Sequence, residues 1–505
     1  MASSAYKLIP GDFTPIPSLA PERVVNLRPV TAFSGEVGAV GVAVTSDADV
    51  PDGVGLDREA LARVGFDGKL GQTLVVPGPA PTTILVGAGA AADVTAATVR
   101  DLAATFARAA TSSARIGMRL PDTDRVDAET IGRVAAEGIL LGRYRYSELK
   151  TEPKTVTLEA VELLVDAADV AGATAGIAHG VVAARAAAVA RDLANTPPGH
   201  LTATDFGNVA VSLAESFGLE VEIADKAKLI ELGCGGLLGV NAGSAEEPRM
   251  ITIRYTPNDP STGHLALVGK GIMYDSGGIS LKPSDPMHLL MKMDMGGAAA
   301  VFGAMTALRD LGCTTTVSAF LMCTDNMPSG SAYKLGDVLT ARGGTTVEVK
   351  NTDAEGRLVM MDGLVLAAEQ KPDAIIDIAT LTGAALMALG PATAALFGND
   401  QALVDQVRSA SSPTDEQLWQ LPLEKKYRKT LDSDIADIAN LGGPYAGATT
   451  AALFLSEFVD GLPWAHLDIA GTMQSEADDG WRSKGATGYG ARLLIETAMT
   501  FSPTR

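Results

Sequence analysis

Two acidic residues and an arginine lie close together at Asp353, Glu355 and Arg357, between two apolar stretches. Residues 347–349 predict a short strand before them, and residues 358–369 predict a helix after them. In an open α/β sheet, ligands bind at the carboxyl ends of the strands, where such a turn would lie. The segment therefore predicts a ligand site, with carboxylates for a cation and a guanidinium for an anion. The alternative is that Asp353 only caps the helix and Glu355 only occupies its first turn.

Further acids follow other predicted elements of the same part of the chain. Asp275 comes shortly after a predicted strand at 265–268, and Asp294 stands where a helix should begin. In a parallel sheet these two side chains would meet Asp353 and Glu355 in one crevice. Carboxylates crowded into a small buried site repel one another and lose hydration, which raises their pKa values or unfolds the site. Divalent cations remove this difficulty, and a cluster of this size predicts two of them.

The ligand types bear on which metal is bound. A site rich in carboxylate oxygen suits Mn²⁺ or Mg²⁺, and Zn²⁺ can also use carboxylates. The chain has five histidines, with neither an HExxH motif nor a pair four residues apart. A mononuclear zinc protease based on histidine ligands is therefore not expected.

Two lysines and the arginine need separate explanations. Lys270 and Lys282 flank Asp275 in the sequence. A lysine beside metals could ligate only as the neutral amine, or it could stay charged and stabilise an oxyanion. A third interpretation is a surface lysine with its head in water. Arg357 cannot act as a base, but it can hold a substrate carboxylate or a bicarbonate with two hydrogen bonds.

Composition limits the class of protein. The chain has 505 residues, is 47% hydrophobic and 20% charged, and can therefore bury a large core. Its formal net charge of −20 would repel nucleic acid and anionic membranes, so we expect neither as a partner. Three cysteines without paired spacing fit a reducing cytosol. We expect a cytoplasmic location, because residues 1–21 lack a signal-peptide pattern and no apolar run of membrane-spanning length is evident.

Alternating strand and helix patterns predict an α/β protein with two domains. The smaller N-terminal α/β domain is expected at residues 1–166, a linking alanine-rich helix at 167–195, and the larger catalytic domain at 196–505, with a mixed, largely parallel sheet covered by helices. The strands predicted in the first domain are 36–45, 72–76, 83–86 and 155–165, and its helices are 93–110 and 127–141. In the second domain we predict strands at 219–223, 250–255, 265–268, 316–322, 347–349, 374–379 and 465–467, and helices at 297–311 and 358–369.

A glycine-rich turn in the first domain offers a competing interpretation. Gly87 and Gly89 follow a predicted strand and precede a helix, which nearly forms a dinucleotide-binding fingerprint. Ala92 replaces the last glycine, and no acidic residue stands where the ribose partner is expected. A nucleotide-dependent oxidoreductase remains an alternative on this feature alone.

The stretch around Asp353 and Glu355, together with six other segments, resembles the signature motifs of the leucine (cytosol) aminopeptidase family of dinuclear metallopeptidases. The resemblance covers roughly residues 185–500 and is loose in the N-terminal domain, where it is concentrated at 137–142. The matching segments are Asn351–Leu358, Val268–Gly271, Asp275–Gly278, Asp294–Ala299, Ala379–Ala384, Trp464–Gly471 and Gly485–Gly488.

The resemblance implies a role for each residue of the site. Asp275 and Glu355 would bridge two divalent metal ions, Mn²⁺ or Zn²⁺ with Mg²⁺ as a further option. Asp353 would complete one metal site, and Lys270, as a neutral amine, would complete the other together with Asp294. The residues implied to act on the substrate are Lys282, which would stabilise the tetrahedral intermediate, and Arg357, which would hold a bicarbonate as proton acceptor. The implied pocket for the first side chain of the substrate consists of Met291, Thr380, Gly383, Ala470 and Met473.

The resemblance also implies the activity. It is the release of N-terminal amino acids, leucine and similar apolar residues preferred, from peptides with a free N-terminus, by attack of a metal-bridging hydroxide. A homohexamer is implied as the assembly. Two other interpretations stay open: a different metal-dependent hydrolase on the same carboxylates, such as a phosphatase, and a DNA-binding regulator, against which the net charge of −20 argues.

Overall fold

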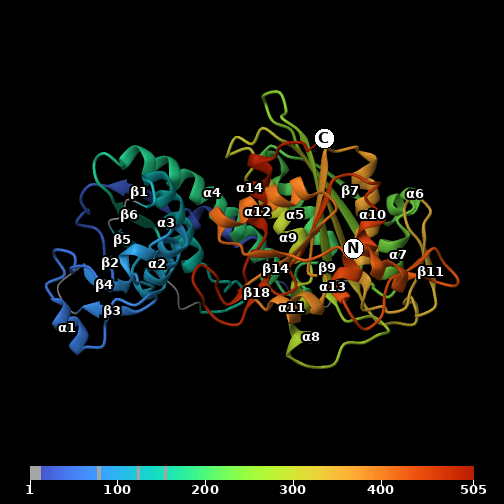
Figure 1. Cartoon of the computed structure of the whole chain (residues 1–505), viewed down its shortest axis with the longest axis horizontal. Coiled ribbons are helices and arrows are strands. Elements are labelled where there is room, and N and C mark those ends of the chain that lie inside the picture. The colour runs from blue at the N-terminus through green and yellow to red at the C-terminus, as the bar shows by residue number, and fades with distance from the viewer. Residues whose placement is uncertain (1–8, 10–12, 77–80, 122–124, 153–155, 505) are drawn as a thin grey trace. The chain divides into compact units, whose positions relative to one another are not determined.

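The computed structural model describes residues 9, 13–76, 81–121, 125–152 and 156–504. The chain divides into two compact units (Figure 1). Residues 16–188 and 475–484 form one, here called the N-terminal unit, and residues 1–15, 189–474 and 485–505 form the other, the C-terminal unit. Parts of two sequence predictions, the strand at 155–165 and the N-terminal stretch 1–21, fall outside the described residues.

The N-terminal unit contains a six-stranded sheet in which only the last pairing is antiparallel among the described residues. Its strands, in spatial order, are β1 (Asn26–Val30), β6 (Ala160–Leu164), β5 (Arg115–Arg119), β2 (Ala39–Val44), β4 (Thr82–Gly87) and β3 (Thr73–Val76). Every residue of β2 is buried, as expected of a strand that is covered on both faces. The predicted strands are confirmed, whereas β1 and β5 were not predicted.

Helices cover both faces of this sheet. The helices are α1 (Arg58–Arg63), α2 (Ala96–Ala109) and α3 (Ala128–Arg143), with short 3₁₀ turns at Pro17–Leu19, Pro21–Arg23 and Ala91–Asp93. Side chains of α2 and α3, such as Phe106 and Ile139, pack against one face, and Leu61 of α1 packs against the other. The segment 475–484 joins this unit through Trp481, which packs against the buried Leu141.

The glycine-rich turn after β4 serves packing. A side chain at Gly87 would overlap with the backbone carbonyl of Lys69, so only glycine allows the strand and the 68–71 loop to lie this close. The chain then forms a 3₁₀ turn at Ala91–Asp93 before α2 begins at Ala96. The near-fingerprint therefore has a structural explanation that does not require a nucleotide.

The C-terminal unit contains an eight-stranded mixed sheet, which confirms the predicted fold class. Its strands, in spatial order, are β15 (Leu418–Gln420), β14 (Ala394–Gly398), β17 (Trp464–Asp468), β13 (Ala374–Ala379), β9 (His264–Asp275), β10 (Thr316–Asn326), β8 (Arg249–Tyr255) and β7 (Glu220–Ala224). The central four, from β17 to β10, are parallel to one another. The carboxyl ends of these central strands therefore lie at one edge of the sheet.

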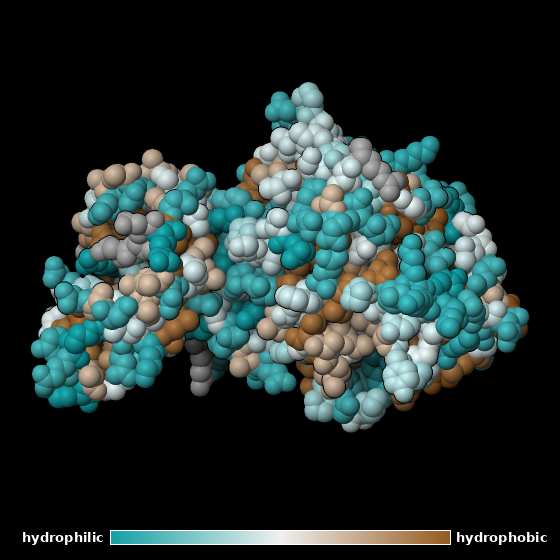
Figure 2. Space-filling view, viewed as in Figure 1, coloured by the Kyte–Doolittle hydropathy of each residue, from teal (hydrophilic) through white to brown (hydrophobic). Residues whose placement is uncertain are grey.

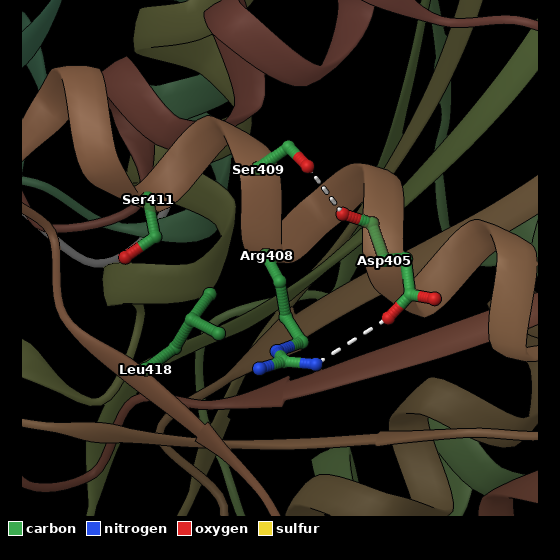
Figure 3. A pocket seen from close by; sticks show the side chains of 5 residues that line it. All are labelled: Asp405, Arg408, Ser409, Ser411 and Leu418. Atoms are coloured by element: carbon green, nitrogen blue, oxygen red, sulfur yellow. Dashed lines mark hydrogen bonds and ion pairs between the residues drawn. The ribbon is translucent and has the colours of Figure 1, made fainter.

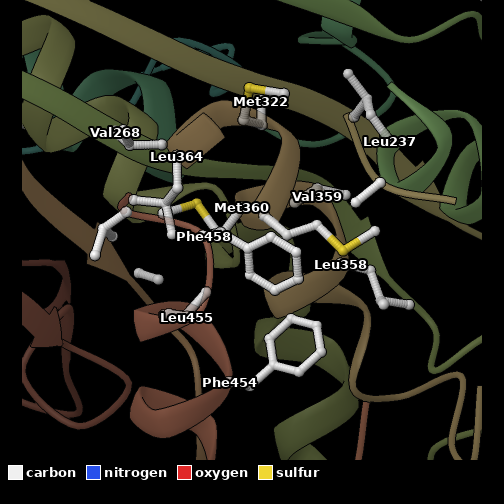
Figure 4. Close-up of a cluster of buried hydrophobic side chains, with 14 of the residues drawn as sticks. Leu237, Val268, Met322, Leu358, Val359, Met360, Leu364, Phe454, Leu455 and Phe458 are labelled. Carbon is white, nitrogen blue, oxygen red and sulfur yellow. The ribbon is translucent and has the colours of Figure 1, made fainter. Parts of the chain in front are cut away.

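Helices α9 (Gly296–Met305) and α10 (Glu355–Glu369) lie on opposite faces of this sheet. Gly269 of β9 faces Ala298 of α9, whereas the neighbouring Val268 faces Gly363 of α10. Successive strand residues point to opposite faces, so the two helices sandwich the strand. On the face of the sheet that α10 covers, buried side chains form a large apolar cluster, which Figure 4 shows in close-up. It includes Met322, Leu358, Leu364, Phe454 and Phe458.

The described residues also form further helices and turns. They are α4 (Val170–Asn195), α5 (Ala203–Phe217), α6 (Lys226–Leu232), α7 (Gly235–Asn241), α8 (Pro286–Leu290), α11 (Gly383–Leu389), α12 (Gln401–Thr414), α13 (Gly447–Ser456) and α14 (Ala491–Thr500), with 3₁₀ turns at Met291–Met293 and Lys425–Leu431.

The sequence prediction placed the strand before Asp353 in the main sheet, and this is wrong. That strand, β12 (Thr346–Glu348), belongs to a separate three-stranded sheet with β11 (Val338–Thr340) and β16 (Ile438–Ala439). A short apolar run carries no information about which sheet it joins, because both sheets bury such a strand equally well. A further two-stranded sheet pairs Gln474–Ser475 with Gly485–Ala486.

Helix α4 is long and apolar enough, by length and composition, to cross a membrane, which the sequence analysis did not expect. In this structure 56% of its most apolar window is buried inside the protein, as in core helices of globular proteins that meet the same criterion. Alanine explains the difference, because it raises the mean hydropathy of the window without forming a run of large apolar residues.

On the face seen in Figure 2 the surface is mostly hydrophilic, with scattered apolar residues.

Candidate metal centre and substrate pocket

The charged residues of the candidate site converge at the carboxyl ends of the central strands. Strand β9 is longer than predicted and runs through Lys270 to Asp275, so both residues lie within the strand instead of after it. Asp294 lies two residues before α9 begins at Gly296, and Glu355 is the first residue of α10. Glycines allow the longer strand, because a side chain at Gly269 would approach the backbone of α9 to 2.7 Å.

A glycine turn joins Asp275 to the segment that carries Lys282. Gly277 and Gly278 have φ angles of +87° and +66°, which a residue with a side chain rarely adopts. Thr352 fastens this turn to the acidic segment, because its hydroxyl donates to the carbonyl of Gly277 at 2.7 Å. The turn and the start of α10 therefore form one hydrogen-bonded assembly.

Lys270 lies between two carboxylates. Its Nζ lies 2.8 Å from Asp294 Oδ2 and 2.8 Å from Glu355 Oε1, and it donates to the carbonyl of Thr380 at 2.8 Å. The hydroxyl of Thr380 donates to the other oxygen of Asp294 at 2.7 Å. All four side chains are buried. The end of β13 is thereby connected to β9, α9 and α10 through polar groups.

Lys282 has the same arrangement on the other side of the cluster. Its Nζ lies 2.8 Å from Asp275 Oδ2 and 2.6 Å from Asp353 Oδ1. The second oxygen of Asp275 accepts from the side-chain nitrogen of Asn326 at 2.8 Å and from the backbone of Gly277 at 2.9 Å. Asp275 is thus fixed from two sides, whereas the side chain of Asp353 is 32% exposed.

Burial and mutual repulsion shift the pKa values of these groups. Burial, and then repulsion by Asp275, raises the pKa of Glu355 to about 8. Burial also raises the pKa of Asp294 to about 6, although Lys270 opposes the shift. Burial alone would lower the pKa of Lys270, but the surrounding carboxylates raise it well above its ordinary value. The carboxylates around Lys270 therefore favour its ammonium form.

The donor set fits divalent cations. One carboxylate oxygen each from Asp275, Asp353 and Glu355 lie within 4.8 Å of one another. The second oxygen of Glu355, Oε2, is buried and has no hydrogen-bond partner among the described residues. Leaving a buried carboxylate oxygen unsatisfied is costly, and a cation would satisfy it. Lys270 and Asp294 complete a second group of donors around Glu355.

Arg357 lies two residues further along α10, where burial lowers its pKa to about 10. One of its terminal nitrogens donates to the carbonyl of Asn440 at 2.9 Å, which holds the guanidinium in place. Its Nε is buried without a hydrogen-bond partner among the described residues. A donor in this position can bind an anion, as the sequence analysis predicted.

A pocket of about 250 Å³ opens beside the carboxylates. Lys282, Asp294 and Asp353 line one part of it, and most of the remaining wall is apolar. All five residues predicted for the substrate pocket line it: Met291, Thr380, Gly383, Ala470 and Met473.

The structure adds pocket residues that the sequence analysis missed. They are Met287, Leu290, Met293, Leu381, Thr382, Leu386 and Gln474. Met287 and Leu290 come from the short helix α8, whose start was detectable in the sequence. Asp285 caps this helix by accepting from His288 at 3.1 Å, and Pro286 occupies its first position.

A second hollow lies away from the carboxylates, along α12 and β15 (Figure 3). Its volume is about 410 Å³. The polar side chains there contact one another: Arg408 lies 3.4 Å from Asp405, and Ser409 donates to the backbone carbonyl of Asp405 at 2.8 Å. These groups are exposed, i to i+3 or i to i+4 contacts on one helix, which is ordinary for a solvated helix face.

Comparisons with known proteins agree with this geometry. The model of the cytosol aminopeptidase family's catalytic domain matches residues 188–495, and the model of that family's N-terminal domain matches residues 50–153. A probable cytosol aminopeptidase of Alkaliphilus metalliredigens (strain QYMF) is 43% identical over 457 residues, which cover 88% of this chain and 91% of that protein. One of Pseudomonas fluorescens (strain SBW25) is 40% identical over 493 residues, covering 95% and 98%.

Solved structures have the same fold. The bottromycin maturation enzyme BotP in complex with Mn superposes with a TM-score of 0.84 at 39% identity, covering 92% of this chain and 99% of that one. A point mutant of tomato leucine aminopeptidase superposes with a TM-score of 0.86 at 30% identity, covering 95% and 98%. Models of both domains of the family match this chain, relatives are about 40% identical over most of its length, and the acidic cluster fits divalent cations. The chain therefore belongs to the cytosol aminopeptidase family and is a metal-dependent aminopeptidase.

Proposed function

We propose that this aminopeptidase removes leucine and similar apolar residues from the N-termini of peptides. One observation carries the proposal: a pocket of about 250 Å³ has carboxylates and a lysine at one part and methionine and leucine side chains around the rest. Moving an apolar first side chain of the substrate from water to this wall would contribute about 25 cal/mol of binding free energy for each Å² of apolar surface buried. The free α-amine beside it would lie at the part of the pocket that Asp294 and Asp353 line.

The ligands proposed for two divalent cations are Glu355 and the four charged residues around it. Asp275 and Glu355 would contact both ions, Asp353 would complete one site, and Lys270 with Asp294 would complete the other. When bound, the pair of ions supplies the Lewis acidity that makes water a nucleophilic hydroxide near neutral pH. Mn²⁺ or Zn²⁺ is proposed, with Mg²⁺ as a further option; Mn is the metal named for the related BotP structure.

Lys270 would have to lose its proton to act as a ligand. Its pKa is high only because the carboxylates around it are negative. Added positive charge in the cluster reverses that effect and favours the neutral amine.

Asn326 and Gly277 keep Asp275 in one orientation, because both donate to the same oxygen.

Lys282 and Arg357 are proposed to act on the reacting groups. Lys282 lines the pocket and lies at the edge of the carboxylate cluster, so its ammonium can stabilise the negative charge that develops on the scissile carbonyl oxygen. Arg357, with its unpartnered Nε, is proposed to hold a bicarbonate that accepts the proton of the attacking water.

The assembly and the location are further parts of the proposal. We propose that the protein assembles as a homohexamer, as its resemblance to the leucine (cytosol) aminopeptidases implies. We also propose a cytoplasmic location, which the cytosol aminopeptidase relatives and three buried, unpaired cysteines support. The domain boundaries proposed from the sequence are residues 1–166, 167–195 and 196–505.

The test compares two substrates that differ only at the amine. The Mn²⁺-loaded protein should hydrolyse leucine anilide but not N-acetyl-leucine anilide, because acetylation removes the free amine that the acidic part of the pocket is proposed to hold. Phenyl phosphate in the same panel tests the interpretation as a different metal-dependent hydrolase. Equal hydrolysis of the free and acetylated anilides, or hydrolysis of the phosphate ester alone, would contradict the proposed function.

A further inference from the structure

Gly296 is the first residue of α9, directly behind the wall of the substrate pocket. It lacks a side chain where Met473 needs the space: a Cβ at residue 296 would overlap with the terminal methyl carbon of Met473 and lie 3.0 Å from its sulfur. Met473 is 5% exposed and lines the pocket. The absence of a side chain at Gly296 therefore allows the Met473 thioether to lie back against α9.

Two hydrogen bonds hold the backbone of Met473 in place against such an overlap. Its amide donates to the carbonyl of Ile469 at 3.1 Å, and its carbonyl accepts from the amide of Thr487 at 3.0 Å. Only the flexible end of the side chain is free to turn. Met473 itself lines the pocket, so the pocket is the open space into which this side chain can turn.

From this geometry we infer that Gly296 determines the depth of the substrate pocket, and hence the size of the N-terminal side chain that it accepts, through the position of Met473. The inference rests on the proposed function of the pocket. A methyl group at residue 296 pushes the Met473 thioether into the pocket, which then excludes leucine and still admits alanine. Gly296 is thus a specificity-determining residue that does not contact the substrate.

Other glycines near the pocket differ from Gly296 in what they face. A side chain at Gly471 would overlap with the backbone carbonyl of Gly390, which cannot turn away. A side chain at Gly356 would lie 2.8 Å from Nζ of Lys270 and so disturb the charged cluster directly. At Gly296 the nearest obstacle is a flexible thioether, and φ is not positive, so alanine is compatible with both the helix and the fold.

The experiment measures kcat/KM for leucine anilide and alanine anilide with the Mn²⁺-loaded protein and four variants. Gly296→Ala should lower the leucine-to-alanine ratio of kcat/KM at least about tenfold, the size typical of one methylene in an apolar pocket. Met473→Ala removes the obstructing group, so Gly296→Ala combined with Met473→Ala should have the same ratio as Met473→Ala alone. Gly330→Ala is the control, because a Cβ there meets nothing within 4 Å and φ is not positive.

The outcomes separate the inference from the function on which it rests. An unchanged ratio in Gly296→Ala, or equal losses on both anilides together with weaker Mn²⁺ binding in calorimetry, overturns the inference alone. The second result would mean that alanine displaces Asp294, two residues away, instead of Met473. A wild-type protein that binds Mn²⁺ and hydrolyses neither anilide overturns the proposed function, and the inference with it.

Discussion

Asp468 holds Thr382 at two points. One oxygen of its carboxylate accepts from the backbone amide of Thr382 at 3.3 Å, and the other accepts from the hydroxyl at 2.6 Å. The first oxygen also accepts from the amides of Leu381 and Ala470, each at 3.2 Å. Since Thr382, Leu381 and Ala470 all line the pocket, one buried carboxylate at the end of β17 positions a large part of its wall.

We predict that Asp468→Asn lowers kcat/KM for leucine anilide about tenfold or more, because a small displacement of positioning groups is costly in catalysis. The amide supplies only one acceptor oxygen in place of two, so at least one hydrogen bond to the 381–382 turn is lost. Mn²⁺ affinity should fall by far less than the roughly tenfold or more that is typical when a group bonded to a metal ligand is removed, because Asp468 accepts its hydrogen bonds from Leu381, Thr382 and Ala470 and from no proposed ligand.

Asp373→Asn is the matched control for this prediction. Asp373 also caps a strand end of the same sheet, accepting from His264 at 2.7 Å, but at the opposite edge from the pocket. If both variants lose activity equally, Asp468 acts through stability and not through the pocket wall.

Lys282→Ala is expected to lower kcat by about 10²-fold, the size found when one donor to a developing oxyanion is removed. Mn²⁺ affinity should fall far less, since Lys282 contacts the carboxylates Asp275 and Asp353 but is not proposed as a ligand. Steady-state kinetics and calorimetry on the same sample separate the two quantities. Parallel losses of kcat and metal affinity would assign Lys282 to the ligand set, and Lys228→Ala, which removes an exposed ion pair, is the control.

A pH dependence of stability is expected from Asp362 in α10. Burial raises the pKa of its carboxyl to about 7, although backbone amides of Arg342 and Leu237 donate to it and oppose the shift. The folded protein then holds this proton more tightly than the unfolded chain does. Its contribution to the free energy of unfolding therefore decreases as the pH rises from about 4 towards 7, and it is constant above that range.

Scanning calorimetry from about pH 5 to 8 checks this expectation, with Asp362→Asn as the variant that cannot titrate. The transition temperature of the wild type should fall with pH relative to that of the variant. Asp437→Asn is the control, because hydrogen bonds from Thr346 lower the pKa of Asp437 and leave it ionised throughout. A difference between wild type and Asp362→Asn that does not change with pH would contradict the shifted pKa.

Much of the site was predictable because its residues lie next to strong local signals. Asp294, Asp353 and Glu355 stand at or near helix starts that apolar periodicity locates, and the two helices that begin there, α9 and α10, cover opposite faces of the same sheet. The pocket residues Met291 and Met473 came from the family resemblance, since isolated methionines carry no local signal.

The errors also have physical causes. The strand containing Lys270 was predicted too short because Gly269 and Gly271 interrupt its apolar run, although they are there to admit α9 and Cys323. The strand before Asp353 was assigned to the wrong sheet because periodicity does not encode strand order.

The account depends on two divalent cations among Asp275, Asp294, Asp353, Glu355 and Lys270. Glu355→Ala removes the carboxylate common to both proposed sites, and it should abolish metal binding and activity while the fold persists. Circular dichroism verifies the fold of this variant. Binding of Mn²⁺ should raise the free energy of unfolding of the wild type by about 2.7 kcal/mol at a hundredfold excess over Kd, and that of the variant not at all.

The most direct measurement is a titration of chelator-treated protein with Mn²⁺, followed at each step by bound metal per chain and by hydrolysis of a leucine dipeptide. We expect no hydrolysis before metal is added, and full activity when two equivalents are bound. Hydrolysis of the dipeptide by the metal-free protein, or saturation without metal at this cluster, would contradict the account.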